Sequence, residues 1–372
     1  MPRTMQLLAA IVILVSAFDS AWLKAADEDG FKPLFNGRDL SGWVLVNTPP
    51  QTWSVEDGML VCTGKPVGEL RTDRMFQNFI LEVEWRHMVP KGNAGIFVWA
   101  DDITSKGVPF HRSIEVQVLE NAYGQSQHHT THGDIFPIHG ATMTPINGRG
   151  GGRAFPTEER SKPSPEWNHY RIECNAGNIS LAVNGKGVTR GTEASPRKGY
   201  ICIESEGGVV HYRNMKLKEL PETPVDALHV AIANRGYRSI YTGLDLAGWN
   251  ATVSGKSHWH VQDWVLSYDG KSTPAEAALS SEETLDGNGF LFDIRPDKEF
   301  RSLSLCGAEL AEGLKAEQWH RVEGTVRDGK LSVTIDGQTA LTDHGVPEGG
   351  KFVLAPHGAS DFTNIFLRTL KD

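Results

Sequence analysis

The residues with the clearest capacity for chemistry lie in "IEVQVLE" (114–120). Apolar residues at 114, 116 and 118 alternate with Glu115 and Gln117, which predicts a strand with one apolar and one polar face. If Leu119 is a β-bulge, Glu120 returns to the polar face and three acid or amide groups lie in a row. This face either belongs to a site or is the solvated face of an ordinary antiparallel sheet.

A dense group of imidazoles follows within a dozen positions, in "HHTTHGD" (128–134). His128, His129, His132, Asp134 and His139 share one segment, and histidine can be a base, an acid or a metal ligand near neutral pH. The spacing His129-x-x-His132-x-Asp134 could bind zinc, but it has neither a helix nor a downstream ligand pair to support it. We therefore predict proton transfer rather than a metal, and no cofactor.

The elements that must position these residues are short strands. The chain has 372 residues, 39 of them Gly and 19 Pro, and shows no long stretch of helical periodicity. Runs such as "NFILEVEWRH", "AGIFVWAD", "WNHYRIEC" and "GYICIESEG" are β-branched or aromatic-rich and are separated by turn residues. "VNGK" and "IDGQ" predict hairpin turns of the Asn-Gly and Asp-Gly kind. These patterns predict an all-β sandwich fold.

Composition excludes some partners and indicates export. The net charge is −9 with no basic stripe, so nucleic acid is not an expected partner. Residues 1–26 contain Arg3, an apolar run and small residues at 25 and 26, which resembles a signal peptide, so we expect a periplasmic or extracellular protein without a membrane anchor after cleavage. The four cysteines show no metal or redox spacing; disulfides and buried free thiols are both compatible with export.

The chain contains an internal repeat. "LFNGRDLSGW" (34–43) recurs as "IYTGLDLAGW" (240–249), displaced by 206 positions, whereas "WNHYRIECNAGNISLAVNG" (167–185) matches "WHRVEGTVRDGKLSVTIDG" (319–337), displaced by 152. This predicts two tandem sandwich domains, 29–220 and 235–372, joined by a linker at 221–234. The second copy lacks the 54 residues by which the offsets differ, and these correspond to the middle of the first copy. Since the missing part holds the chemical residues, we expect a chain ending near Leu220 to keep any activity.

The same blocks carry a resemblance to a known family. "FKPLFNGRDLSGW", "WSVEDGMLVCTG", "ELRTDR", "GNAGIFVWA", "IEVQVLE", "EWNHYRIEC" and "YRNMKLKEL" resemble, in order and wording, the 3-keto-disaccharide hydrolase family, also described as a 3-keto-glucoside 1,2-lyase/2-hydroxy-glucal hydratase domain. The resemblance implies a concanavalin A-like jelly-roll sandwich. It also implies cleavage of 3-keto-glycosides by elimination and hydration, with a small carbohydrate as the partner. Over 235–371 it covers the framework blocks only.

Further candidates follow once a sugar is the expected ligand. Arg71, in "ELRTDR", matches a family position and would contact substrate or a neighbouring carboxylate. Arg86 shares a polar face with Glu82 and Glu84 that could run beside Glu115, where it would hold either substrate or a carboxylate. Trp99 would stack on a sugar ring or lie in the core. The Gly-rich "GRGGGRAF" predicts a lid that carries Arg149 or Arg153.

The predicted site combines these groups. We assign Glu115, His132 and Asp134 to catalysis, and the residues expected to bind substrate are Arg71, Arg86, Trp99, Gln117, Glu120 and His139. One alternative is a retaining glycosidase, because "EVQVLE" resembles the E-x-D-x-x-E strand of β-glucanases, although Gln117 stands where that motif has Asp. Another is a carbohydrate-binding protein without catalysis.

Overall fold

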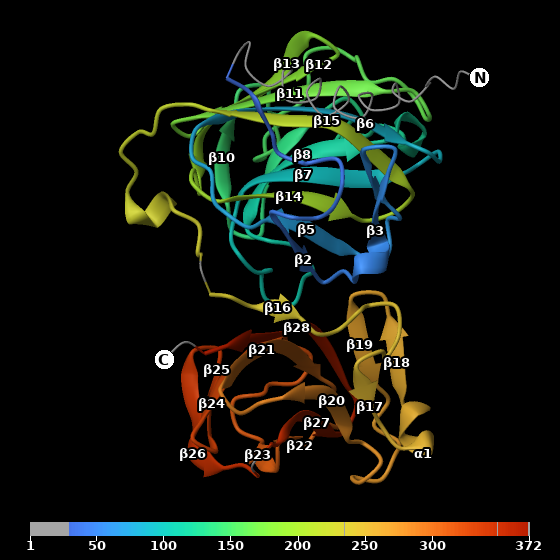
Figure 1. Ribbon diagram of the computed structural model, residues 1–372, viewed down its shortest axis with the longest axis vertical. Helices are drawn as coiled ribbons and strands as arrows, with labels where there is room; N and C mark the ends of the chain where they lie inside the picture. The colour runs from blue at the N-terminus through green and yellow to red at the C-terminus, as the bar shows by residue number, and fades with distance from the viewer. Residues whose placement is uncertain (1–29, 234, 348, 371–372) are drawn as a thin grey trace, which may run out of the picture.

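The chain folds into two β-sandwich halves, described here from a computed structural model (Figure 1). The structure describes residues 30–233, 235–347 and 349–370, so the predicted signal peptide lies outside the described residues. Helix within this part is limited to α1 (Val253–Lys256) and the 3-10 turns η1 (Pro50–Thr52), η2 (Asn121–Tyr123) and η3 (Ala227–His229). In these ranges no helix has the length and apolar character needed to cross a membrane.

The first half consists of two packed antiparallel sheets. The nine-stranded sheet has the order β10 (Thr142–Pro145), β13 (Lys186–Ser195), β12 (Asn178–Val183), β11 (Asn168–Asn175), β6 (Phe79–His87), β15 (Val210–Glu219), β4 (Met59–Cys62) and β3 (Trp53–Glu56), with β1 (Lys32–Pro33) beside β15. The six-stranded sheet has the order β2 (Trp43–Val46), β5 (Gly68–Thr72), β14 (Tyr200–Ser205), β7 (Asn93–Ala100), β8 (Ser113–Leu119) and β9 (Ile135–Ile138).

The core of this half is formed by the facing sides of the two sheets. Ile114 and Val116 from β8 and Tyr170 and Ile172 from β11 are fully buried in one cluster, as the alternation of apolar residues predicts. The all-β sandwich predicted from sequence is therefore confirmed.

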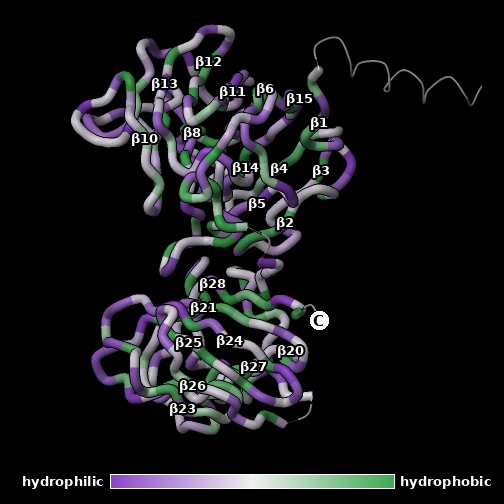
Figure 2. Tube along the Cα trace, turned by 90° about the vertical axis from the view of Figure 1, so that its left-hand side faces the viewer, coloured by the Kyte–Doolittle hydropathy of each residue, from purple (hydrophilic) through white to green (hydrophobic). Residues whose placement is uncertain are grey.

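The second half is a separate sandwich with its own core. One sheet has the order β18 (Trp259–Gln262), β19 (Val265–Tyr268), β28 (Ser360–Thr369), β21 (Asn288–Pro296), β24 (His320–Arg327), β25 (Lys330–Ile335) and β26 (Gln338–Gly345), with β16 (Arg238–Ser239) beside β28. The other has the order β17 (Trp249–Asn250), β20 (Leu279–Thr284), β27 (Lys351–His357), β22 (Ser302–Leu305) and β23 (Ala308–Leu310). Phe290, Phe292 and Phe352 are fully buried between the sheets. In Figure 2 hydrophobic stretches follow strands of both halves, and many connecting loops are hydrophilic.

The two halves have matching strand orders. Read from β3, the larger sheet of the first half runs β3-β4-β15-β6-β11-β12-β13, and the larger sheet of the second runs β18-β19-β28-β21-β24-β25-β26. The smaller sheets correspond in the same way, β2-β5-β14-β7-β8 with β17-β20-β27-β22-β23. Among the described strands, β9 and β10 of the first half have no counterpart, and both lie in the segment that the second half lacks.

The loop before β8 docks into the second half through a buried polar network. The carboxylate of Asp293, which is fully buried, accepts hydrogen bonds from the backbone N–H of Gly107 (2.9 Å), from Asn364 Nδ2 (2.7 Å) and from Arg321 Nε (2.8 Å). Gly107 has a φ of +74°, and a Cβ there would lie 2.4 Å from the Trp319 ring, so only glycine fits. An apolar cluster drawn from both halves lies beside this network: Val46, Ile103, Tyr237, Leu291 and Phe366.

Two local predictions are settled by the backbone. The turns at Asn184-Gly185 and Asp336-Gly337 have positive φ at both residues (49° and 85°, 48° and 78°), as hairpin turns of this kind require, so the prediction is confirmed. The four cysteines are free thiols, three of them buried.

Candidate active site

The outer face of the six-stranded sheet of the first half carries a group of buried carboxylates. On β8, Ile114, Val116 and Val118 face the core, so Glu115 and Gln117 point to the opposite side, and both are more than 90% buried. By the same alternation Glu69 on β5 and Glu204 on β14 lie on this face, directly opposite each other in the ladder. Polar strand residues that are buried on the outer face of a sheet are not a simple solvated surface, because loops must cover them.

Glu115 and Glu204 meet above a glycine. A Cβ added to Gly95 on β7 would lie 3.0 Å from Glu115 Oε1 and 2.9 Å from Glu204 Oε2, so these two oxygens are at most 5.9 Å apart, the sum of the two distances. Any side chain at position 95 would occupy the space between them. Glycine is therefore what allows the two carboxyl groups to approach each other.

A polar chain links this pair to the edge of the face. Gln117 Nε2 donates to Asn93 Oδ1 (3.0 Å), and Asn93 Nδ2 donates to Glu206 Oε2. Burial raises the pKa of Glu206, although the bonds from Glu204 and Asn93 oppose this. Gln117 thus serves to fix Asn93, and Asn93 in turn orients Glu206.

The electrostatics of the face favour protonated carboxyl groups. Burial, reinforced by the nearby charge of Glu206, raises the pKa of Glu115 from 4.5 to about 8, while Arg153 acts in the opposite direction. Burial and the charges of Glu115 and Glu206 raise the pKa of Glu204 well above its usual range. A carboxyl group whose pKa lies near neutrality can both give and take a proton under physiological conditions.

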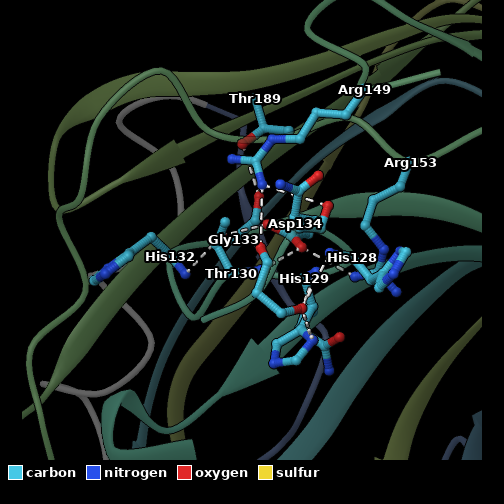
Figure 3. Close-up of polar contacts among 12 residues, drawn as sticks. His128, His129, Thr130, His132, Gly133, Asp134, Arg149, Arg153 and Thr189 are labelled. Atoms are coloured by element: carbon cyan, nitrogen blue, oxygen red, sulfur yellow. Dashed lines mark hydrogen bonds and ion pairs between the residues drawn. The ribbon is translucent and has the colours of Figure 1, made fainter. Parts of the chain in front are cut away.

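Asp134 and Arg153 form the cationic side of the site. Asp134 is fully buried, and its carboxylate accepts hydrogen bonds from the backbone N–H and hydroxyl of Thr130 and from Arg153 Nη1 (3.0 Å). The Arg153 guanidinium also lies 3.3 Å from the centre of the Phe136 ring, and Phe136 is the cross-strand partner of Glu115. Asp134 therefore holds Arg153 beside Glu115 (Figure 3).

His132 lies on the other side of Asp134 from Arg153 (Figure 3). Its Nδ1 accepts from the backbone N–H of Ser161 (3.3 Å), and its Nε2 lies 3.5 Å from Glu159. Burial lowers the pKa of His132, so the imidazole is predominantly neutral at pH 7. The structure therefore does not join His132 to Glu115 as predicted; the imidazole instead ties the 128–134 segment to residues 159–161.

His139 and Arg71 lie at the border of the site. His139 is exposed, stacks on Phe110 with ring centres 6.2 Å apart, and has its pKa lowered by desolvation. Arg71 shares the outer face with Glu69, but its guanidinium stacks on the Tyr200 ring (4.1 Å) and Nη1 donates to the carbonyl of Thr72. Arg71 is thus held by an aromatic ring and the backbone.

Three predicted substrate-binding residues are corrected by their positions. Arg86 is on β6 of the other sheet, with its guanidinium 3.3 Å from His211 Nδ1 and over the Trp167 ring, so the whole core separates it from Glu115. Trp99 has a φ of +56° where the β7–β14 register shifts, and this bulge turns its ring into the core. Glu120 follows the end of β8 and accepts from the backbone N–H groups of three loop residues: Lys91, Ala122 and Ser164.

Several residues of the face were not found from the sequence. Glu204 and Glu206 alternate with Ile203 and Ser205 in "GYICIESEG", which is the same period-2 signal that identified Glu115. The sequence could not show that β14 lies between β5 and β7, and so next to Glu69. His111 has no sequence pattern around it at all.

One group of described side chains has the chemistry to hold a metal ion. Glu69, His111 and Cys202 are fully buried, and their ligand atoms all lie within 4.8 Å of one another. His111 Nε2 and Glu69 Oε2 are 2.9 Å apart. Neither atom makes a hydrogen bond of acceptable geometry.

Comparisons with known proteins agree with this fold. A family model described as "3-keto-alpha-glucoside-1,2-lyase-like domain" matches residues 30–218. Two solved structures of putative glycosyl hydrolases from Parabacteroides distasonis ATCC 8503 are similar, with 20% and 22% identity and TM-scores of 0.41 and 0.39, covering 53% and 51% of this chain and 97% and 99% of theirs. A Bacillus licheniformis beta-glucanase has 14% identity and a TM-score of 0.35, over 51% of this chain and 97% of its own. No curated protein matches. The family match supports an activity on carbohydrates.

Proposed function

Because the chain belongs, through residues 30–218, to the 3-keto-alpha-glucoside-1,2-lyase-like family, we propose that its first half cleaves 3-keto-glycosides by elimination followed by hydration. The ketone at carbon 3 makes the hydrogen on carbon 2 acidic. A base removes this proton to give an enolate, which expels the oxygen on carbon 1 and leaves a C1=C2 double bond conjugated to the restored ketone. Water then adds its oxygen to carbon 1 and a proton to carbon 2. The reaction requires a base, an acid and a group that stabilises the enolate.

The observation that carries this proposal is the meeting of Glu115 and Glu204 above Gly95. Two carboxyl groups at most 5.9 Å apart can reach neighbouring carbons of one sugar ring from the same face. Arg153 lies beside Glu115 and favours its ionised form, so Glu115 is the base that takes the carbon-2 proton. Glu204 is then the acid that protonates the departing oxygen.

Arg153 has a second role in this reaction. A guanidinium stabilises negative charge on an oxygen, and the enolate develops such charge on the carbon-3 oxygen. Asp134 fixes the guanidinium from behind through its 3.0 Å contact. In this proposal Asp134 is a positioning residue, whereas the sequence assigned it to catalysis.

The retaining glycosidase alternative loses its acid in this arrangement. In the E-x-D-x-x-E pattern Glu120 would donate a proton to the leaving group. Both oxygens of Glu120 instead accept backbone hydrogen bonds, which lower its pKa against the effect of burial. A carboxylate held in this way is a poor proton donor at neutral pH.

We further propose that the second half is a degenerate copy without a site. If β14 is matched with β27 by their pairing, Cys202 and Glu204 correspond to Val353 and Ala355. The equivalent of Glu115 falls at Gly307, in the tight turn between β22 and β23. The acidic groups are thus replaced one by one while the strand order is retained. Export of the protein, expected from residues 1–26, remains part of this proposal.

The proposal is tested by incubating the full chain with 3-keto-glucosides of both anomers and with the unoxidised parent glucosides. Release of the aglycone from the keto compounds alone, with transient enone absorbance, is the expected result. Glu115→Gln and Glu204→Gln should each lose most turnover, whereas Glu312→Gln, an exposed carboxylate of the second half, should not. Turnover of the unoxidised parent would overturn the proposal, and binding without turnover of either compound would support the carbohydrate-binding alternative.

A further inference from the structure

The buried trio of Glu69, His111 and Cys202 is unexplained by the reaction above. We propose that these three side chains bind one divalent transition-metal ion of the zinc class. This inference rests on the geometry of the trio and stands independently of the proposed function.

The three ligands come from separate segments that converge on one point. Glu69 is on β5, Cys202 on β14 and His111 on the loop before β8, and all their ligand atoms lie within 4.8 Å of one another. Around a tetrahedral zinc, nitrogen, oxygen and sulfur ligand atoms are roughly 3.3–3.8 Å apart. The 2.9 Å between His111 Nε2 and Glu69 Oε2 is a few tenths of an ångström shorter, so a small side-chain rotation is sufficient to admit the ion.

The trio also contains buried polar atoms that lack partners. Glu69 Oε2 and both ring nitrogens of His111 make no hydrogen bond, although both side chains are fully buried. A buried polar atom without a partner costs about 1–3 kcal/mol. A metal ion would provide a ligand bond for Glu69 Oε2 and His111 Nε2 at once.

The donor set favours zinc over the hard cations. A thiolate and an imidazole are preferred by Zn²⁺ and its neighbours, whereas Mg²⁺ and Ca²⁺ prefer oxygen ligands only. Binding replaces the proton on Cys202 Sγ with a metal–sulfur bond, and that proton passes to the solvent. Three protein ligands leave a fourth position, which a water molecule would fill. Glu204, directly opposite Glu69 in the ladder, is placed to accept a hydrogen bond from that water.

The loop that carries His111 is held rigidly from both ends. Arg112 forms an ion pair with Asp101 (2.9 Å), and Asp102 accepts from Arg235 Nε (2.6 Å). The tip of the loop is fixed by the bond from Gly107 to Asp293 in the second half. His111 is thus preorganised, which reduces the entropy lost when it binds an ion.

The experiment measures metal content and the spectrum of a cobalt-substituted protein. The full chain is produced in medium supplemented with zinc or with cobalt, dialysed, and assayed by plasma mass spectrometry. We expect about one metal ion per chain, and a thiolate-to-cobalt charge-transfer band in the near ultraviolet. Cys202→Ser should remove the band, and His111→Gln should lower metal content at least about tenfold, as loss of a ligand does. Cys174→Ser, which changes a buried thiol elsewhere in the first half, and His139→Gln should change neither.

The outcomes separate this proposal from the proposed function. Absence of metal from the unsubstituted protein after zinc or cobalt supplementation overturns the site, whether or not 3-keto-glycosides are cleaved. A cobalt spectrum without the thiolate band overturns Cys202 as a ligand. If a ligand variant fails to fold, the spectrum of the unsubstituted protein still decides the question, because it requires no variant.

Discussion

Replacing Glu115 with glutamine should make the protein more stable at alkaline pH. Burial and the charge of Glu206 raise the pKa of this carboxyl from 4.5 to about 8 in the folded chain. Between these two pH values the folded state binds the proton and the unfolded state does not, so the free energy of unfolding falls as pH rises. A shift of 3.5 pH units corresponds to at most about 5 kcal/mol, and the neighbouring carboxyl groups share part of it. Glutamine cannot ionise, so the variant should be more stable by about 2–5 kcal/mol at pH 8 and nearly equal to the original protein at pH 5.

Urea denaturation followed by tryptophan fluorescence, repeated from pH 5 to pH 9, measures this difference. Glu312→Gln serves as the control, because an exposed carboxylate should give a curve parallel to that of the original chain at every pH. If the Glu115→Gln curve is also parallel, Glu115 is ionised at neutral pH in the folded chain. The account of the acidic face as a protonated cluster would then be refuted.

Three further substitutions test separate parts of the structure. Gly95→Ala places a methyl group 2.9 Å from Glu204 Oε2 and 3.0 Å from Glu115 Oε1, so turnover of a 3-keto-glucoside should fall sharply. Gly187→Ala, where a Cβ meets nothing within 4 Å, should retain turnover, and equal rates for the two variants would contradict the pairing above Gly95. Arg153→Gln removes the cation beside Glu115; kcat should fall about 10²-fold and the rising limb of its pH profile should move to higher pH, whereas Arg149→Gln should leave the profile unchanged. Asp293→Ala leaves Arg321 largely buried without its partner, which should cost about 3–5 kcal/mol in thermal or urea unfolding. Asp286→Ala, at an exposed position, should cost less than about 0.5 kcal/mol.

Period-2 alternation predicted the strands and the direction of Glu115 and Gln117 correctly. It could do so because β8 is regular and its apolar side faces a core, so only one register buries Ile114, Val116 and Val118. The same rule was wrong at Trp99. Alternation from Gly95 and Phe97 would put this ring on the face of the carboxylates, but the bulge at its positive φ turns it inward.

The site as a whole could not be predicted, because it depends on strand order. Glu204 is 89 residues from Glu115 along the chain and meets it only because β14 and β8 both flank β7. Arg86 fails for the complementary reason. Its strand has the expected polar face, but β6 belongs to the other sheet, and a local pattern does not say which sheet a strand joins.

The second half also has more consequence for the first than the repeat suggested. A copy without acidic groups was expected to be dispensable, so that a chain ending near Leu220 would keep any activity. The structure gives a physical reason to expect otherwise, because Asp293 and Asn364 hold the loop that leads to His111, and Arg321 Nη2 donates to the carbonyl of Thr104 in that loop. Removing residues 235–372 would leave these loop carbonyls and N–H groups without their partners and expose Val46 and Ile103. The degenerate half thus replaces chemistry with support, which explains how its framework could be retained while its charged residues were lost.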